Sequence, residues 1–178
     1  MPDLTTKDVL IVGVDESAHG DAALRYALEE AGRRGATLRV VIACHPPEMS
    51  AYSYAIYQVS NPKQVRTAAA AAVGRRVEEI RSSLPVAAAV QVEVVAESGS
   101  PVSVLVDAAR DAALLVVGHR GRGGLRSALL GSVGLGVVLN APCPVTVVPA
   151  AVLDGVSDGV RRSVSEAPPL PLPVGPIA

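Results

Sequence analysis

Residues 113–132, ALLVVGHRGRGGLRSALLGS, hold the pattern that decides how this chain folds. The stretch begins with an apolar run that stops at Gly118, which is typical of a buried strand entering a loop. It ends at Gly131 and Ser132, where a new apolar periodic stretch opens, so these two residues are expected at a helix start. A strand, a glycine loop and a helix N-terminus in this order present free backbone N–H groups to an anion. The stretch therefore predicts phosphate binding.

Alternating strand and helix patterns on both sides of this stretch predict an α/β domain. Strands are expected over residues 9–14, 37–43, 90–95, 113–117 and 144–148, and helices over 21–34, 63–82, 101–112 and 132–140. This alternation makes the strands parallel, with right-handed crossovers and helices on both faces of an open sheet. We expect a doubly wound, Rossmann-like sheet of five strands in the order 3-2-1-4-5.

The composition fits a sheet that is buried on both faces. Hydrophobic residues make up 49% of the chain and aromatic residues only 2%, so Ala, Val, Leu and Ile must form the core. A net charge of −1 gives no electrostatic reason to expect a nucleic acid or a membrane surface as partner. The two cysteines, Cys44 and Cys143, lack metal-ligand spacing and are interpreted as small buried hydrophobic residues.

The chain divides into a nucleotide-binding domain and a tail. Residues 1–150 carry the alternating pattern and are expected to fold as one domain. Residues 151–178 lack periodicity and become rich in proline, which predicts a flexible tail. No apolar run reaches the length of a membrane span, and we expect a cytoplasmic protein.

Asp15 and Gly118 are expected to lie on one crevice. In a doubly wound sheet the ligand binds outside the carboxyl ends of the strands, where the strand order reverses. With the order 3-2-1-4-5 the reversal falls between the first strand, which Asp15 follows, and the fourth, which Gly118 follows. The Asp15 carboxylate could accept a hydrogen bond from a ribose hydroxyl or an exocyclic amine, or it could simply cap the first helix.

Several motifs in the chain resemble those of the universal stress protein family. The spacing G-x2-G-x9-G-[ST] is met by Gly118, Gly121, Gly131 and Ser132. Further shared motifs are VGVDES at 12–17, LLVVG at 114–118 and APCPVTVV at 141–148, so that the resemblance covers about residues 6–149. It implies a protein that binds ATP or another adenine nucleotide. Mg²⁺ would be carried by the nucleotide and not by a dedicated protein cage.

Carried over by position, the resemblance implies a set of nucleotide contacts. Asp15 and Ala43 would contact the adenosine portion, while backbone amides and one hydroxyl would wrap the phosphates. The expected phosphate contacts are Gly118, Gly121, Gly131, Ser132 and Val133, and the loop residue Arg120 could add a charge-assisted bond. His119 and Gly134 stand where hydroxyl residues are common in the family, which leaves the preference for a triphosphate open.

The sequence holds no constellation that predicts catalysis. The motifs H-E-x-x-H and G-x-S-x-G are absent, and His119 is the only candidate base in the loop. We expect no catalytic residues and no metal ligands, with at most slow, incidental hydrolysis of ATP.

The last strand predicts self-association. Val145–Val148 is apolar and is expected at a sheet edge, where pairing with a second copy across a two-fold axis would protect it. The resemblance implies the same pairing. We therefore expect a homodimeric sensor or regulator of the stress response, acting on an unidentified partner protein.

Two other hypotheses stay open. In one, the domain binds no nucleotide and works as a dimeric interaction module through its edge strand or its Pro-rich tail, so that deletion of 151–178 would abolish function. In the other, it is a slow ATPase or an adenylyl-transferring enzyme, whose turnover would depend on His119 or Asp15.

Overall fold

The computed structural model describes residues 8–15, 17–44, 62–119 and 130–149, and within them five parallel strands form one sheet. The strands are β1 (Val9–Gly13), β2 (Thr37–Cys44), β3 (Val92–Ser98), β4 (Leu114–Gly118) and β5 (Val145–Val148). They lie in the order β3-β2-β1-β4-β5, and every pairing is parallel. The predicted fold class and strand order are confirmed.

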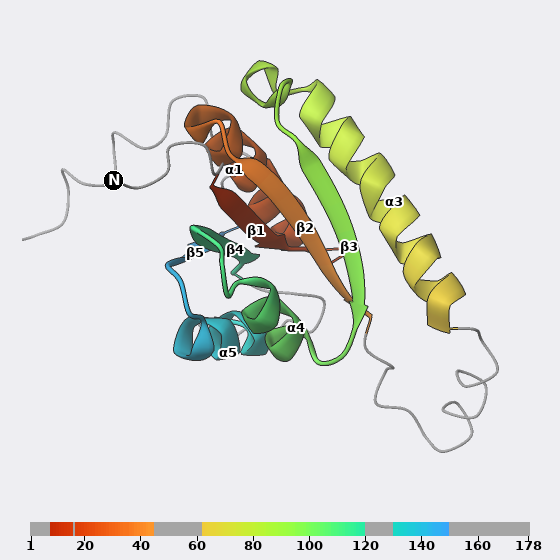
Figure 1. Cartoon of the computed structure of the whole chain (residues 1–178), viewed down its shortest axis with the longest axis vertical. Helices are drawn as coiled ribbons and strands as arrows, with labels where there is room; N and C mark the ends of the chain where they lie inside the picture. The colour runs from red at the N-terminus through yellow and green to blue at the C-terminus, as the bar shows by residue number, and fades with distance from the viewer. Residues whose placement is uncertain (1–7, 16, 45–61, 120–129, 150–178) are drawn as a thin grey trace, which may run out of the picture.

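Helices cover both faces of the sheet (Figure 1). They are α1 (Ala18–Arg34), α3 (Pro62–Ser82), α4 (Pro101–Ala108) and α5 (Ser132–Asn140). Strand β1 is apolar at successive positions because helices cover it on both faces. Leu10 and Val12 pack with α1 and α3 on one face, and Ile11 packs with α4 and α5 on the other. All three side chains are completely buried.

Several element boundaries differ from the sequence expectation, among them the start of α1, which begins at Ala18 and not at residue 21. The helix expected over 101–112 ends at Ala108, because the Ala109 N–H bonds to the carbonyl of Leu105 at 3.1 Å and that of Val106 at 3.3 Å, which tightens the last turn. The strand expected over 90–95 runs instead over Val92–Ser98, since its pairing with β2 continues to the end of both strands. A short 3₁₀ helix, η1 (Pro85–Ala87), precedes it and was not predicted.

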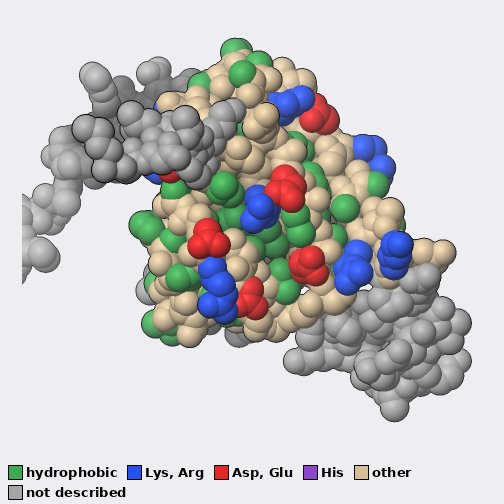
Figure 2. Space-filling view, in the orientation of Figure 1, with side chains coloured by type: hydrophobic (Ala, Val, Ile, Leu, Met, Phe, Trp, Pro, Cys, Tyr) green, Lys and Arg blue, Asp and Glu red, His purple; other side chains and the backbone are tan. Residues whose placement is uncertain are grey.

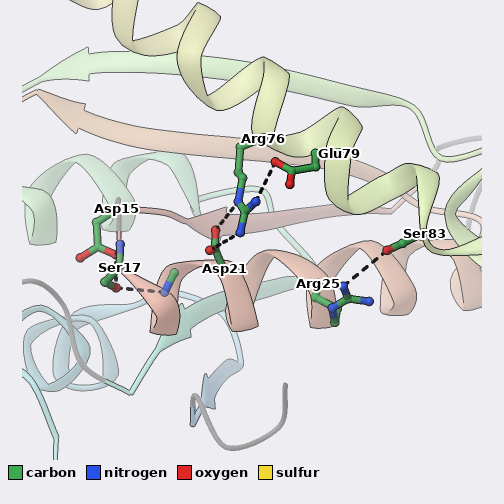
Figure 3. Close-up of polar contacts among 8 residues, drawn as sticks. Asp15, Ser17, Asp21, Arg25, Arg76, Glu79 and Ser83 are labelled. Carbon is green, nitrogen blue, oxygen red and sulfur yellow. Dashed lines mark hydrogen bonds and ion pairs between the residues drawn. The ribbon is translucent and has the colours of Figure 1, made fainter. Parts of the chain in front are cut away.

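A guanidinium joins the two helices on one face of the sheet (Figure 3). Arg76 of α3 donates to both carboxylate oxygens of Asp21 in α1, at 2.9 and 2.5 Å, and to Glu79 at 2.7 Å. These carboxylates raise the pKa of Arg76 above its usual value, the hydrogen bonds with Asp21 most of all. The three groups connect α3 to the first turn of α1, which is the turn that borders the candidate site.

The predicted tail, residues 151–178, lies outside the described residues. In the part of the chain that the structure describes, no helix combines the length and the apolar character needed to cross a membrane.

Candidate functional site

The carboxyl ends of β1 and β2 bring Asp15 and Ala43 to the same edge of the sheet. Gly13 pairs with Val41 in the parallel register, so the residues two positions further along each strand are level with one another. The Val14 N–H donates to the Val41 carbonyl at 3.1 Å and continues the pairing beyond the last residue of β1. Both residues predicted to contact adenosine therefore lie at this edge.

Gly118 ends β4 at the same edge, directly against the first turn of α1. A Cβ at this position would lie 2.7 Å from the carbonyl oxygen of His19 and 2.8 Å from its carbonyl carbon. No side chain fits there unless the backbone moves. The glycine is thus required by the close approach of α1 to the end of β4.

The residue after β4 is held by its main chain on both sides. The His119 N–H donates to the Val148 carbonyl at 2.7 Å, and the His119 carbonyl accepts from the Gly131 N–H at 3.0 Å. These bonds connect the end of β4 to β5 and to the residue that begins α5. They place the α5 N-terminus at the carboxyl edge, beside the point where the strand order reverses.

No side chain among the described residues caps the N-terminus of α5. Gly131 is its N-cap residue and offers no hydroxyl or carboxylate, whereas Ser17 of α1 and Ser100 of α4 each accept a backbone N–H. Ser132 and Val133 open the helix, and the first intrahelical bond runs from Leu135 to the Gly131 carbonyl at 2.9 Å. The N–H groups of the first turn have no partner within the helix, and the helix dipole adds partial positive charge there. An anion is the ligand that such an end favours.

Asp15 supports the α1 cap without being the cap itself. Its Oδ1 accepts from the Ser17 backbone N–H at 3.2 Å and from the Ser17 hydroxyl, while Ser17 caps the helix by accepting from the Gly20 N–H at 3.1 Å. Figure 3 shows this side of the carboxylate directed at Ser17 and the other oxygen turned away from it. Of the two interpretations offered by the sequence, direct capping of the first helix by Asp15 is wrong, because Ser17 is the N-cap residue, and the contact of Asp15 with a nucleotide stays a prediction.

The structure thus gathers most of the predicted site residues along one edge. These are Asp15, Ala43, Gly118, Gly131, Ser132 and Val133. The two remaining ones, Arg120 and Gly121, lie outside the described residues. The contacts of all eight with a nucleotide remain predictions.

One residue at this edge was missed by sequence reasoning. The ring of His19, in the first turn of α1, has its centroid 6.3 Å from that of His119, and the planes are inclined by 37°. A signal was available, because α1 begins directly after β1 and β4 is the neighbour of β1 in the predicted order. The residue one turn into the helix could therefore be expected near the end of β4.

Neither cysteine shows the features of a reactive thiol. Both are free and half-buried, and burial raises the pKa of the Cys44 thiol and of the Cys143 thiol. A raised pKa favours the unreactive thiol form. Among the described residues, no group of three or more His, Cys, Asp or Glu side chains is placed to hold a metal ion.

A concave region lies on the face of the sheet between β3 and α4, and it extends to Glu97 and Ser98 at the carboxyl end of β3. Its volume is about 430 Å³, and its lining includes the apolar Val41, Val95 and Val104. Arg39 and Glu93, which also line it, form an ion pair at 2.7 Å. On the face of the molecule that Figure 2 shows, apolar side chains lie between acidic and basic ones. None of the predicted site residues lines this groove.

Comparison of the sequence with known proteins finds universal stress proteins among its relatives. The profile described as the Universal stress protein family matches residues 8–149. A universal stress protein of Mycobacterium tuberculosis is 33% identical over 152 residues, which cover 79% of this chain and 47% of that protein. One of Mycolicibacterium smegmatis is 33% identical over 141 residues, covering 78% and 47%. The chain spans about half the length of these curated relatives.

Solved structures share the arrangement of helices and strands. A universal stress protein crystallised in complex with cAMP aligns with a TM-score of 0.55 and 26% identity, over 82% of this chain and 99% of that one. The universal stress protein UspA from Lactobacillus plantarum aligns with a TM-score of 0.64 and 22% identity, over 81% and 99%. The second likeness is one of fold alone.

Proposed function

The chain belongs to the universal stress protein family, whose profile matches residues 8–149, and on this premise we propose that it binds an adenine nucleotide at the carboxyl edge of its sheet. The observation that carries the proposal is the N-terminus of α5, which no described side chain caps and which lies where the strand order reverses. A phosphate group is the natural occupant of such an end. The similar structure that was crystallised with cAMP supports an adenine nucleotide as the ligand class.

The two ends of the ligand would contact different residues at this edge. The phosphates would lie against the first turn of α5, where the N–H groups and the Ser132 hydroxyl donate, with the backbone of Gly118 beside them. The adenosine would lie toward Asp15 and Ala43 at the ends of β1 and β2. Arg120 and Gly121 would complete the phosphate contacts. We propose ATP as the physiological ligand, with Mg²⁺ held by the phosphate oxygens.

Family membership also carries the proposal of a role in the stress response. We propose that occupancy by the nucleotide changes which partner protein the domain binds, with at most slow hydrolysis. The described edge supplies groups that bind, and this favours a sensor over an enzyme. The cytoplasmic location stays a prediction.

The first test is to identify what the purified protein carries. Denaturing the freshly purified protein and separating the released small molecules is expected to yield an adenine nucleotide. Calorimetric titration of the stripped protein with ATP, ADP, AMP and cAMP, with and without Mg²⁺, is expected to give a dissociation constant in the micromolar range or tighter, about −8 kcal/mol. An empty protein that shows no binding with any of the four would leave the interaction module as the better hypothesis.

Measuring phosphate release in the same samples separates the sensor from the enzyme. The sensor predicts a bound nucleotide with negligible turnover. Sustained turnover that is lost in the Asp15→Asn or the His119→Ala variant would favour the ATPase.

We further propose that the protein forms a homodimer through β5. The carbonyls of Pro144 and Val148 accept from β4, at 3.0 and 2.7 Å. Because main-chain groups alternate along a strand, those of Val145 and Val147 face away from β4, on the side where the sheet ends. An apolar edge of this kind is protected by pairing with its copy.

The Val147→Pro variant is expected to be monomeric. Proline removes the outward N–H of residue 147 without touching the two bonds to β4, and it is tolerated at sheet edges. Sedimentation velocity over a range of concentrations measures the change, with far-UV circular dichroism as the control for folding. A folded variant that still sediments as a dimer, or a wild-type protein that is monomeric throughout, would remove β5 as the interface.

A further inference from the structure

We propose that His19 and His119 form a binding site for a divalent transition-metal ion such as Zn²⁺ or Co²⁺, and that a phosphate oxygen of the bound ligand completes its coordination. The ring centroids are 6.3 Å apart, and the two residues come from different elements, the first turn of α1 and the end of β4. The second half of the proposal rests on the proposed function. The first half, binding of the ion by the two imidazoles, does not.

The ring separation is close to what one ion requires. Two nitrogens bound to one tetrahedral Zn²⁺ lie about 3.3 Å apart, because each Zn–N bond is about 2.0–2.1 Å long. The ring centroids lie 6.3 Å apart, so the two rings must approach each other slightly when they bind one ion.

The backbones that carry the two rings are held in place. The His119 main chain bonds to Val148 at 2.7 Å and to Gly131 at 3.0 Å. The carbonyl of His19 packs directly on Gly118, where no Cβ would fit. A metal site gains from ligands on rigid elements, since less freedom is lost when the ion binds.

The imidazole nitrogens are available. Both side chains are half-buried, and neither makes a hydrogen bond or an ion pair with another described residue. Each ring thus keeps a nitrogen to offer as a ligand in the part of the chain that the structure describes.

The donor type decides which ions fit. Imidazole suits Zn²⁺, Cu²⁺, Ni²⁺ and Co²⁺, whereas Mg²⁺ selects oxygen ligands. The pair is therefore distinct from any Mg²⁺ that accompanies a nucleotide. His119 stands at a position where hydroxyl residues are common in the family. The histidine pair would therefore add an affinity for a metal ion that the glycine motif alone does not provide.

Two protein ligands leave coordination positions open. No third His, Cys, Asp or Glu among the described residues completes the set. The neighbouring feature is the α5 N-terminus, since the His119 carbonyl accepts from the Gly131 N–H. A phosphate bound at that end would present oxygen to an ion held by the two rings. We therefore expect the ion and the phosphate ligand to strengthen each other's binding.

The test is a titration of the metal-free, nucleotide-free and tag-free full chain with Co²⁺, followed by visible absorption. His19→Ala and His119→Ala are each expected to weaken Co²⁺ binding at least about tenfold, because loss of even an outer partner of a metal ligand costs that much. His45→Ala, which removes the third histidine of the chain, is the matched control and is expected to leave the affinity unchanged. Equal Co²⁺ affinity in the wild type and the two site variants would overturn the proposal.

A measurement on the wild-type protein guards against misfolded variants. Added Zn²⁺ is expected to shift the ring resonances of His19 and His119 together in the NMR spectrum and to leave those of His45 in place. Shifts confined to His45, or to none of the rings, would also overturn the metal site.

Repeating the Co²⁺ titration with AMP tests the phosphate half. AMP is the probe because it chelates free metal weakly, and a coupled site predicts an affinity for Co²⁺ that rises by about 5–150-fold. If calorimetry shows that AMP binds but the Co²⁺ affinity does not change, the coordination by phosphate is wrong and the histidine pair stands. If no adenine nucleotide binds at all, the proposed function fails, while the titration without nucleotide still decides the metal site.

Discussion

Replacing Gly32 by alanine is expected to lower the free energy of unfolding by about 1–3 kcal/mol, the usual effect of forcing extra volume into a packed contact. Gly32 lies in α1 where that helix touches η1. A Cβ there would stand 2.2 Å from the carbonyl oxygen of Val86 and 2.8 Å from its carbonyl carbon. Both atoms belong to the backbone, so α1 and η1 must move apart, and this disturbs the core on that face of the sheet. Urea denaturation followed by circular dichroism measures the loss.

Gly74 in α3 provides the matched control. It is also a glycine within a helix, but a Cβ at its position meets no atom within 4 Å. Alanine there is expected to raise the free energy of unfolding by about 0.5–1 kcal/mol, because it reduces the conformational freedom of the unfolded chain at no steric cost. The two substitutions are therefore predicted to act with opposite sign. A Gly32→Ala variant as stable as Gly74→Ala would show that η1 does not press on α1.

These two glycines also show where sequence reasoning stops. Each stands inside a helical pattern, and nothing in the neighbouring residues tells them apart. The difference arises from η1, a turn between α3 and β3 that has no apolar period and was not predicted. Close approaches between elements that are distant in the sequence depend on tertiary packing, which local patterns do not encode.

The strands and their order, by contrast, were predictable for a physical reason. A parallel sheet covered on both faces needs apolar side chains at successive positions, and the runs at 9–13 and 114–117 supply them. Helices that alternate with such strands leave few topologies. The ends of elements were less predictable, since Ala108 ends α4 by a tightened turn that no glycine or proline announces.

In the candidate site, too, some features follow from local sequence patterns and others do not. The glycine spacing placed Gly118, Gly131 and Ser132 at the carboxyl edge, because a strand end and a helix start are local features. The approach of His19 to His119 combines the start of α1 with the end of β4, and it follows from the predicted strand order and not from a local motif. The assignment of Asp15 needed the structure itself, since only the structure shows Ser17 as the cap.

The Ser132→Asp variant is expected to bind adenine nucleotide at least about a hundredfold more weakly than the wild type. Ser132 is the first residue of α5 and is exposed at the edge where the phosphates are proposed to lie. A carboxylate there meets the phosphates, and a like-charge contact of this kind costs several kcal/mol. The Ser132→Ala variant removes only a hydroxyl donor and is expected to lose about 0.5–1.5 kcal/mol of binding free energy. Calorimetric titration with ATP and Mg²⁺ measures both.

The same substitution is expected to stabilise the fold, and this separates a role in binding from a role in folding. An acidic side chain in the first turn of a helix interacts favourably with the helix dipole, by about 0.3–1 kcal/mol. Ser103→Asp, at an exposed position in the first turn of α4, is the matched control: it should stabilise the protein to a similar extent and leave nucleotide affinity unchanged. A helix end that served only the architecture would gain stability from Ser132→Asp and show no change in binding. A helix end that holds phosphate must lose affinity while the protein becomes more stable, since the aspartate carboxylate then competes with the phosphates for the free N–H groups of α5.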